Sequence, residues 1–288
     1  MLFPYAGNKS TIAAEILPYF PSTIQDYWEP FCGTCTIAHR LQDRIQGNIY
    51  LSDTNRQMIY FFRSLATPLA LLEEVYKLYQ CPDLPDWEEP GADRVLPFLK
   101  EVHAKISTCY NSESDAELRS RLREGLNRHI QEDSASYLVQ GAVFYVVQRL
   151  AHSGVYRVNR KGSFNVPLTR SIAEPLKPSH WQKILDWSLP ASFDTHPYWA
   201  SPYNPRHSES LIYVDPPYLG ADQNYSAAGF DQERLVQWIA TRTCKVIASN
   251  SIEALPLYAS LPGTVHFIDR PDRVGRAAAK REILYVSH

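Results

Sequence analysis

The fold class follows from two consecutive stretches, residues 23–41 (TIQDYWEPFCGTCTIAHRL) and residues 48–65 (NIYLSDTNRQMIYFFRSL). Each starts with a short β-prone run, continues through a loop containing Gly, Asp or Asn, and passes into a helical pattern. Two such units in a row are typical of a doubly wound α/β sheet, in which ligands bind at the carboxyl ends of the strands. The alternation resumes later with a strand at 211–218, a helix at 231–243 and strands at 244–251 and 281–288.

The middle of the chain has a different character. Residues 81–100 are rich in proline and acid, and residues 114–131 form a charged helical pattern that we expect to be exposed. We therefore predict a mainly helical insertion at 66–140 in a domain made of residues 1–65 and 141–288. Residues 136–152 are too apolar for a linker, and we expect this helix to pack back on the core.

Composition restricts the class of protein. The 288 residues are 44% hydrophobic, which supports a full core, and the net charge of −2 gives no overall sign of a nucleic-acid binder. The chain shows no secretory leader and no apolar run of membrane-spanning length, so we expect a cytoplasmic protein. Five widely spaced cysteines favour reduced thiols, and the pair Cys32 and Cys35 lacks the partner motif of a zinc site, so we predict no metal.

Three acids follow predicted strands: Glu29, Asp53 and Asp215. In a doubly wound sheet these positions converge on one crevice. An acid after the second strand suits a ribose, because a carboxylate can accept hydrogen bonds from both hydroxyl groups. Each acid alone favours a helix cap, but three together, with glycine turns beside them, favour a ligand site.

The stretch at 211–220, LIYVDPPYLG, places an acid, two prolines and a tyrosine at a strand end. Asp215 and the carbonyl of Pro216 form a stiff pair of acceptors for N–H donors. Two acceptors acting on an exocyclic aromatic amine favour a pyramidal nitrogen with an available lone pair. The ring of Tyr218 offers a flat face to a flipped-out base.

Two glycine turns accompany these acids. Gly7 and Gly33 allow backbone N–H groups to approach a ligand closely, and Lys9 can place a cation on a carboxylate or phosphate. Neither turn is a phosphate-binding loop of the G-x-x-x-x-G-K type, and there is no complete G-x-G-x-x-G, which disfavours a nicotinamide or flavin cofactor.

In order along the chain, these motifs resemble those of the Dam-type DNA adenine N6-methyltransferases. The similar elements are PYAGNKS (4–10), EPFCGTC (29–35), LSDTN (51–55), YRVNRKGSFNVPLTR (156–170), DPPY (215–218), GFDQERL (229–235) and IASNS (247–251). The resemblance implies a Rossmann-like α/β methyltransferase sheet, with the helical insertion as the DNA target-recognition domain. It also implies direct transfer of a methyl group from S-adenosylmethionine to adenine N6 in DNA, without a metal or a covalent intermediate.

The same resemblance implies roles for individual residues. Those expected to contact the cofactor or form the loop beside it are Tyr5, Gly7, Lys9, Glu29, Phe31, Gly33, Asp53 and Asp215. Those expected to hold the target adenine are Asp215, Pro216, Pro217 and Tyr218.

Two positions depart from the family pattern. Cys35 stands where the cofactor loop has its second glycine, and Asn8 replaces a glycine near the N-terminus. We expect Asn8 to tolerate a left-handed conformation, whereas the side chain of Cys35 is expected to crowd the cofactor or the neighbouring helix.

A local basic stretch suggests DNA contact. Residues 141–185 contain seven Lys or Arg and a single acid, Glu174. Basic stretches can also be solvated surfaces, but interleaved amides can meet base edges while cations meet phosphates. The DNA-binding candidates are Arg157, Asn159, Arg160, Lys161 and Asn165.

These observations predict a site-specific DNA adenine N6-methyltransferase that acts on a flipped-out adenine in duplex DNA. The alternatives are a cytosine-N4 or RNA adenine methyltransferase of the same fold, and a catalytically silent DNA-binding protein in which Cys35 has spoiled the cofactor site. We expect a monomer without membrane contact, and a cognate restriction or phage-defence system is a candidate partner.

Overall fold

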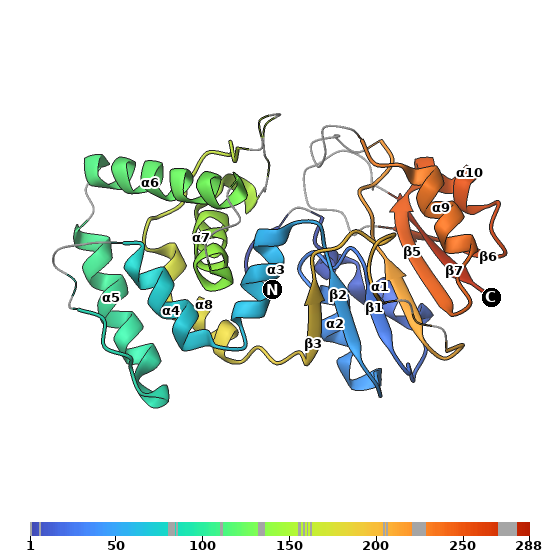
Figure 1. The fold of residues 1–288 in the computed structure, drawn as a ribbon, viewed down its shortest axis with the longest axis horizontal. Helices are drawn as coiled ribbons and strands as arrows, with labels where there is room; N and C mark the ends of the chain where they lie inside the picture. Colours follow the sequence, from blue (N-terminus) through green and yellow to red (C-terminus); the bar gives the residue numbers. More distant parts are fainter. Residues whose placement is uncertain are drawn as a thin grey trace. The chain divides into compact units, whose positions relative to one another are not determined.

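The computed structural model divides the chain into two compact units (Figure 1). Residues 7–54 and 189–288 form a sheet unit, and residues 1–6 and 55–188 form a helical unit. The structure describes residues 2–5, 7–79, 84, 86–109, 112–131, 136–154, 157, 159, 161, 163–203, 205, 207–220, 229–269 and 281–288.

The sheet unit is built on seven strands among the described residues. They are β1 (Tyr27–Glu29), β2 (Ile49–Ser52), β3 (Ala191–Asp194), β4 (Leu211–Val214), β5 (Lys245–Ser251), β6 (Gly263–Asp269) and β7 (Arg281–Ser287). Their order is β3-β2-β1-β4-β5-β7-β6. The first five of these pair in parallel, whereas β7 runs antiparallel to both of its neighbours. This mostly parallel sheet confirms the predicted Rossmann-like α/β class.

Strand β4 lies at the centre of the sheet. All four of its residues are buried, and it pairs with β1 on one side and β5 on the other, with Leu211 opposite both Tyr27 and Lys245. After β1 the chain passes to β2, which pairs with one edge of β1, whereas β4 pairs with the opposite edge of β1. Ligands of doubly wound sheets bind at such a switch point, beyond the carboxyl ends of the strands.

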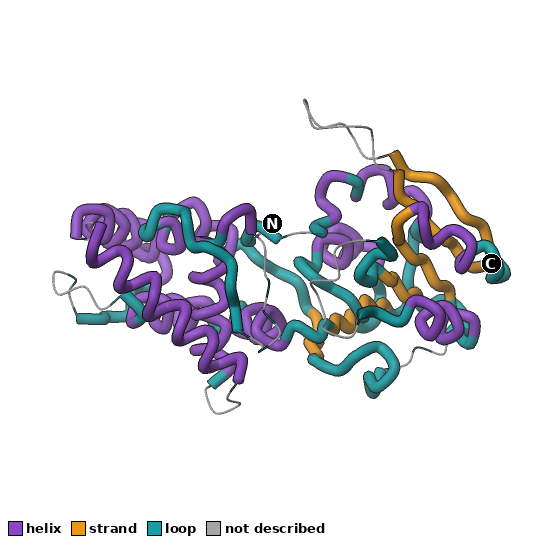
Figure 2. Tube along the Cα trace, turned by 90° about the horizontal axis from the view of Figure 1, so that it is seen from above, coloured by secondary structure: helices purple, strands orange, loops and turns teal. Residues whose placement is uncertain are grey.

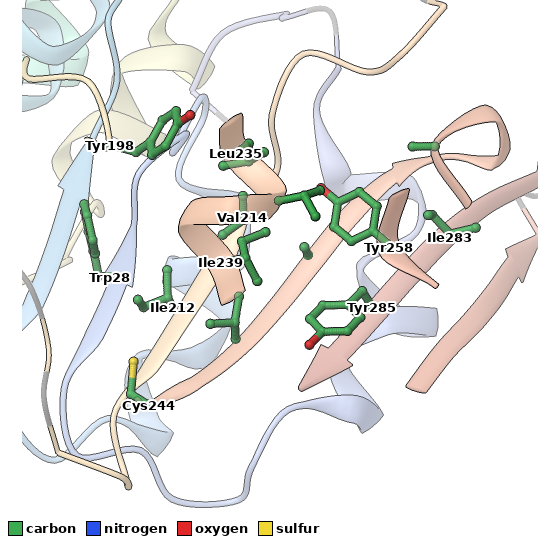
Figure 3. Packing of buried hydrophobic residues seen from close by; sticks show 14 residues of the cluster. Trp28, Tyr198, Ile212, Val214, Leu235, Ile239, Cys244, Tyr258, Ile283 and Tyr285 are labelled. Atoms are coloured by element: carbon green, nitrogen blue, oxygen red, sulfur yellow. The ribbon is translucent and has the colours of Figure 1, made fainter. Parts of the chain in front are cut away.

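A hydrophobic cluster anchors one face of the sheet (Figure 3). Ile212 and Val214 of β4 pack with Leu235, Tyr258 and Tyr285, which come from α9 (Gln232–Ala240), α10 (Leu255–Tyr258) and β7. Helix α9 begins at a strong cap, because the carboxylate of Asp231 accepts a hydrogen bond from the Arg234 amide. The other helical segments of this unit are η1 (Lys9–Thr11), α1 (Ala13–Ile16), η2 (Leu17–Tyr19), α2 (Thr36–Leu41), η3 (Gln42–Arg44) and η7 (Ile252–Ala254).

The helical unit surrounds α7 (Tyr137–Leu150), which is buried at every residue from Gln140 to Leu150. Helices α3 (Arg56–Ser64), α4 (Pro68–Lys77) and α6 (Ser112–Gln131) all pack against α7, and Figure 2 shows this unit as mainly helix. Its remaining helices are η4 (Ala92–Arg94), α5 (Val95–Cys109), η5 (His152–Gly154), η6 (Glu174–Leu176) and α8 (Pro178–Leu185). No helix of the described residues has both the length and the apolar character needed to span a membrane.

The structure differs from the sequence prediction in two respects. The helical unit contains more residues than the insertion predicted at 66–140, since α3, α7 and α8 also belong to it. Helix α7 packs on the core of this helical unit. Strands β3 and β6 were not predicted. Both are edge strands with few buried residues, none in β3 and one in β6, so they lack a continuous buried apolar run.

Candidate active site

The carboxyl ends of four neighbouring parallel strands each carry an acid. Glu29 ends β1, Asp53 follows β2, Asp215 follows β4, and Asp194 ends β3. Because β3, β2, β1 and β4 are adjacent in the sheet, the four acids share one edge. Glu29, Asp53 and Asp215 thus lie at the same edge of the sheet, and their convergence on one ligand crevice stays a prediction.

Asp215 forms a buried ion pair with Lys9. The Nζ atom of Lys9 lies 2.7 Å from Oδ2 of Asp215, and the side chains are 6% and 14% exposed. The ammonium group also donates to the carbonyl of Gly7 at 3.3 Å. Burial raises the pKa of Asp215 above its ordinary value, and Lys9 opposes that rise.

The second carboxylate oxygen of Asp215 has a different environment. Oδ1 is buried and has no hydrogen-bond partner among the described residues. Leaving a buried acceptor unsatisfied is costly, so such atoms mark places where a ligand donor can bind. Asp215 is therefore held by Lys9 through Oδ2, and its Oδ1 can accept a hydrogen bond from a ligand.

The ring of Tyr218 is fixed at its hydroxyl group. That hydroxyl donates to Oε2 of Glu282 on β7 at 2.6 Å, and Glu282 is 3% exposed. The ammonium group of Lys9 lies 4.8 Å from the ring centroid, within cation–π range. Burial, followed by the negative charge of Asp215, raises the pKa of Tyr218 well above its ordinary value, which keeps the phenol neutral.

A buried amide pair supports the backbone of the DPPY segment. Gln232 of α9 donates to the carbonyl of Pro217 at 2.6 Å, and Asn250 of β5 accepts from the amide of Leu219 at 3.1 Å. The two amide side chains are joined, since Asn250 donates to Oε1 of Gln232 at 3.0 Å. The segment after β4 is thus anchored from both α9 and β5.

The loop after β1 is tied to the end of β2. The amide of Gly33 donates to Oδ2 of Asp53 at 3.1 Å, and the amide of Cys32 donates to the carbonyl of Ser52 at 3.0 Å. Gly33 and Gly7 have φ of +47° and +83°. A Cβ added to either glycine would meet no described atom within 4 Å, so open space lies beside both turns.

Glu29 faces the protein interior. It is 2% exposed, and its Oε2 accepts from the Tyr27 hydroxyl at 2.9 Å and from the Ala38 amide at 3.3 Å. Burial raises the pKa of Glu29 well above its ordinary value, although these two hydrogen bonds lower it. Glu29 therefore ties β1 to the first turn of α2.

Phe31 is half-buried in an aromatic group on the same loop. Its ring packs edge-on against Phe230, with centroids 5.6 Å apart, and tilted against Tyr198 at 5.5 Å. Phe230 directly precedes the start of α9, so this contact links the loop after β1 to the segment that anchors Pro217.

The two departures from the family pattern are accommodated differently from expectation. Asn8 has φ −56° and is not left-handed; its Oδ1 instead accepts from the Ser10 amide at 2.7 Å. Cys35 takes the left-handed conformation, with φ +54°, at the cap of α2. Its side chain is 0% exposed, so it lies where a ligand entering from solvent does not reach.

The remaining predicted residues belong to the helical unit. The ring of Tyr5 packs edge-on against Phe3, with centroids 6.1 Å apart. Arg157, Asn159, Lys161 and Asn165 are exposed, whereas Arg160 lies outside the described residues.

Sequence reasoning missed four residues of this site: Asp194, Gln232, Asn250 and Glu282. Oδ2 of Asp194 is buried without a hydrogen-bond partner among the described residues, and its backbone carbonyl accepts from the Asp53 amide at 3.2 Å. The rule that located the other acids, an acid at a strand end, applies to Asp194 once β3 is known. Glu282 carries no local signal, because its role depends on the pairing of β7 with β5.

Comparisons with known proteins agree with this geometry. A family model for the D12 class of N6 adenine-specific DNA methyltransferases matches residues 5–251. The chain is 26% identical over 250 residues to a DNA adenine methylase of Vibrio cholerae, covering 84% of this chain and 76% of that protein.

Two further relatives extend the similarity. The chain is 22% identical over 270 residues to Type II methyltransferase M.MjaIII of Methanocaldococcus jannaschii, covering 86% of this chain and 82% of the relative. It is 21% identical over 299 residues to the Retron Ec67 DNA adenine methylase of Escherichia coli, covering 99% and 90%. The chain belongs to the D12 class of N6 adenine-specific DNA methyltransferases.

Proposed function

We propose that this methyltransferase transfers the methyl group of S-adenosylmethionine to the N6 amine of an adenine flipped out of duplex DNA. The observation that carries the proposal is Oδ1 of Asp215 in the DPPY segment, which is buried and has no hydrogen-bond partner among the described residues. An exocyclic amine supplies the hydrogen-bond donor that this oxygen lacks.

The residues beside the two glycine turns fit the cofactor. Open space next to Gly7 and Gly33 leaves room for a ligand against the backbone, and Asp53 at the end of β2 suits a ribose. Lys9, Glu29, Phe31 and Tyr5 are the further cofactor-side residues that we propose. When bound, S-adenosylmethionine supplies an electrophilic methyl group.

At the target base, protein groups act by position and charge. Oδ1 of Asp215 and the carbonyl of Pro216 accept the two N–H groups of the amine, which favours a pyramidal nitrogen with a free lone pair. Lys9 holds Asp215 in its carboxylate form by pairing with Oδ2. The ring of Tyr218 stacks on the base, a contact worth about 1–3 kcal/mol. Pro217 contributes stiffness and a carbonyl that Gln232 anchors.

We also propose that the helical unit provides DNA recognition, with the insertion at 66–140 and the exposed residues Arg157, Asn159, Arg160, Lys161 and Asn165 taking part. Exposed cations meet phosphates, and exposed amides can reach base edges. A cytoplasmic location, a monomeric state and a restriction or phage-defence partner stay predictions.

Transfer of a labelled methyl group to mixed-sequence duplex DNA, followed by identification of the labelled nucleoside, tests the proposal. We expect N6-methyladenine. Label in N4-methylcytosine, or label that enters RNA in preference to DNA, would replace it with one of the two related activities. Folded protein that binds DNA but gives no heat with S-adenosylmethionine in calorimetry would instead identify a silent DNA-binding protein.

A further inference from the structure

The segment from Ser163 to Arg170 is extended and has two different faces. The even-numbered side chains Phe164, Val166 and Leu168 are 2%, 5% and 7% exposed. The odd-numbered side chains of Asn165, Pro167 and Thr169 are exposed. This period of two is that of a half-buried strand, and the segment contains two bridge residues, Phe164 and Leu168, of which Leu168 pairs with Ala151.

Side chains of α6 satisfy the backbone of this segment. Oδ1 of Asn127 accepts from the Phe164 amide at 2.6 Å, and Arg123 donates to the carbonyl of Val166 at 3.1 Å. Arg119 donates to the carbonyls of Leu168 and Arg170, both at 2.6 Å. Every one of these contacts lies on an even-numbered residue.

The spacing explains why the two elements match. Residues 119, 123 and 127 are four apart and lie on one stripe of α6, with a rise of about 6 Å per step. Two residues of extended chain span about 6.6 Å. The stripe and the segment therefore stay in register, to within about 1 Å, over the two steps from 164 to 168, running in opposite directions.

In this arrangement two arginine side chains of α6 bind the backbone of the same protein. Arg119 and Arg123 donate to backbone carbonyls, and Arg119 also pairs with Asp115 at 3.0 Å. The charged pattern of α6 predicts an exposed helix face. In this part of α6 the charged side chains instead donate to the backbone of a neighbouring segment, whereas Arg128 of the same helix is exposed.

Residues 157 and 159, which precede this segment, are hydrogen-bonded to it. The Asn159 amide donates to the Ser163 carbonyl at 2.8 Å, the Asn165 amide donates to the Arg157 carbonyl at 3.2 Å, and the Arg157 side chain donates to Oδ1 of Asn165 at 3.0 Å. Two of the DNA-binding candidates, Arg157 and Asn159, are thus hydrogen-bonded to Asn165 and Ser163. Asn127 and Arg123 hold the backbone of the neighbouring residues 164 and 166.

We propose that Arg119, Arg123 and Asn127 are positioning residues that set the register of residues 163–170 and so present Asn165, with Arg157 and Asn159 bonded to this segment, to DNA. The inference rests on the proposed DNA-methylating function. It predicts that the stripe controls DNA affinity through geometry, although it does not touch DNA.

Arg123→Ala, Arg123→Lys and Asn127→Ala test the proposal, with Arg128→Ala as the control that removes one positive charge from the same helix. Steady-state methylation should show the KM for DNA raised about tenfold in Arg123→Ala, the effect of about 1.4 kcal/mol. We expect unchanged kcat and unchanged S-adenosylmethionine affinity. Lysine at 123 should restore part of the loss, because its ammonium group can still donate to a carbonyl.

Hydrogen exchange supplies a readout that does not depend on catalysis. The Phe164 amide should exchange faster in Asn127→Ala and at the wild-type rate in Arg128→Ala, because Asn127 is its acceptor. A second mutation, Asn165→Ala, should raise the KM less in the Arg123→Ala background than in the wild type.

The outcomes separate the two proposals. Wild-type protein that methylates DNA, with an unchanged KM for DNA in Arg123→Ala, would overturn the positioning role. Unchanged exchange of the Phe164 amide in Asn127→Ala would also overturn it. Wild-type protein that does not methylate DNA would instead refute the proposed function.

Discussion

Replacing Lys9 with methionine should destabilise the protein most at neutral and higher pH. The substitution removes the partner of Asp215 and leaves its carboxylate in a site that is 14% exposed. Burial already raises the pKa of Asp215 above its ordinary value of 3.8, and Lys9 opposes that rise. Without Lys9 the pKa rises further.

The size of the effect follows from the geometry. At an Nζ to Oδ2 distance of 2.7 Å, the attraction is about 6 kcal/mol for an effective dielectric constant of about 20. Desolvation offsets part of this, and loss of one partner from a buried pair typically costs about 3–5 kcal/mol. Because the raised pKa makes the folded state bind more protons, the loss should shrink as the pH falls towards 3.8.

A double-mutant cycle of Lys9→Met and Asp215→Asn, measured by denaturant unfolding without cofactor, checks this reasoning. Removing both charges should cost less than the sum of the single losses by about 2 kcal/mol or more. The free energy of unfolding of Lys9→Met should fall, relative to wild type, as the pH rises above 3.8. Additive single effects, or a Lys9→Met loss that is independent of pH, would refute the buried-pair account.

Substitutions at three further positions probe the site. Tyr218→Phe, which keeps the ring but loses the bond to Glu282, should lower kcat/KM for DNA about tenfold, and Tyr218→Leu should lower it further because stacking is also lost. An undiminished kcat/KM in Tyr218→Phe would contradict the fixing of the ring, and equal effects of the two substitutions would contradict the stacking. Glu29→Gln keeps the hydrogen-bond acceptor and cannot ionise. Because burial raises the pKa of Glu29, the wild type should lose stability relative to this variant as the pH rises above the ordinary carboxyl pKa of 4.5. Unfolding free energies of the two proteins that change in parallel with pH would contradict this. Cys35→Gly should leave S-adenosylmethionine affinity unchanged in calorimetry, because the thiol is fully buried, whereas tighter binding would support crowding of the cofactor.

The parts of the site that the sequence predicted are those with local signals. Asp215, Asp53 and Glu29 each follow an apolar or aromatic run, and a parallel sheet brings strand ends to one edge regardless of other details. The glycines at 7 and 33 do occupy positive φ. These features depend on a few consecutive residues, and their consequences are general.

What the sequence could not predict depends on contacts between distant segments. Glu282 reaches Tyr218 across 64 positions, and Asn250 reaches the Leu219 amide across 31. The stripe of Arg119, Arg123 and Asn127 has the composition of a solvated helix face, and its purpose depends on the extended segment beside it. Of these two positions the left-handed one is Cys35, at the cap of α2, whereas Asn8 has φ −56°; which of the two loops would adopt that conformation is not marked by either residue type.

The most direct test of the account compares wild type with Asp215→Asn under single-turnover conditions, with labelled S-adenosylmethionine and duplex DNA, and with cofactor and DNA binding measured alongside. The substitution keeps the shape of the side chain but removes its charge and replaces one acceptor oxygen with a donor. The account predicts label in N6-methyladenine for the wild type and a transfer rate about a hundredfold lower in the variant, as for loss of other preorganised hydrogen bonds in active sites. An undiminished rate in Asp215→Asn would contradict the role of Asp215, and label in another base would contradict the adenine assignment.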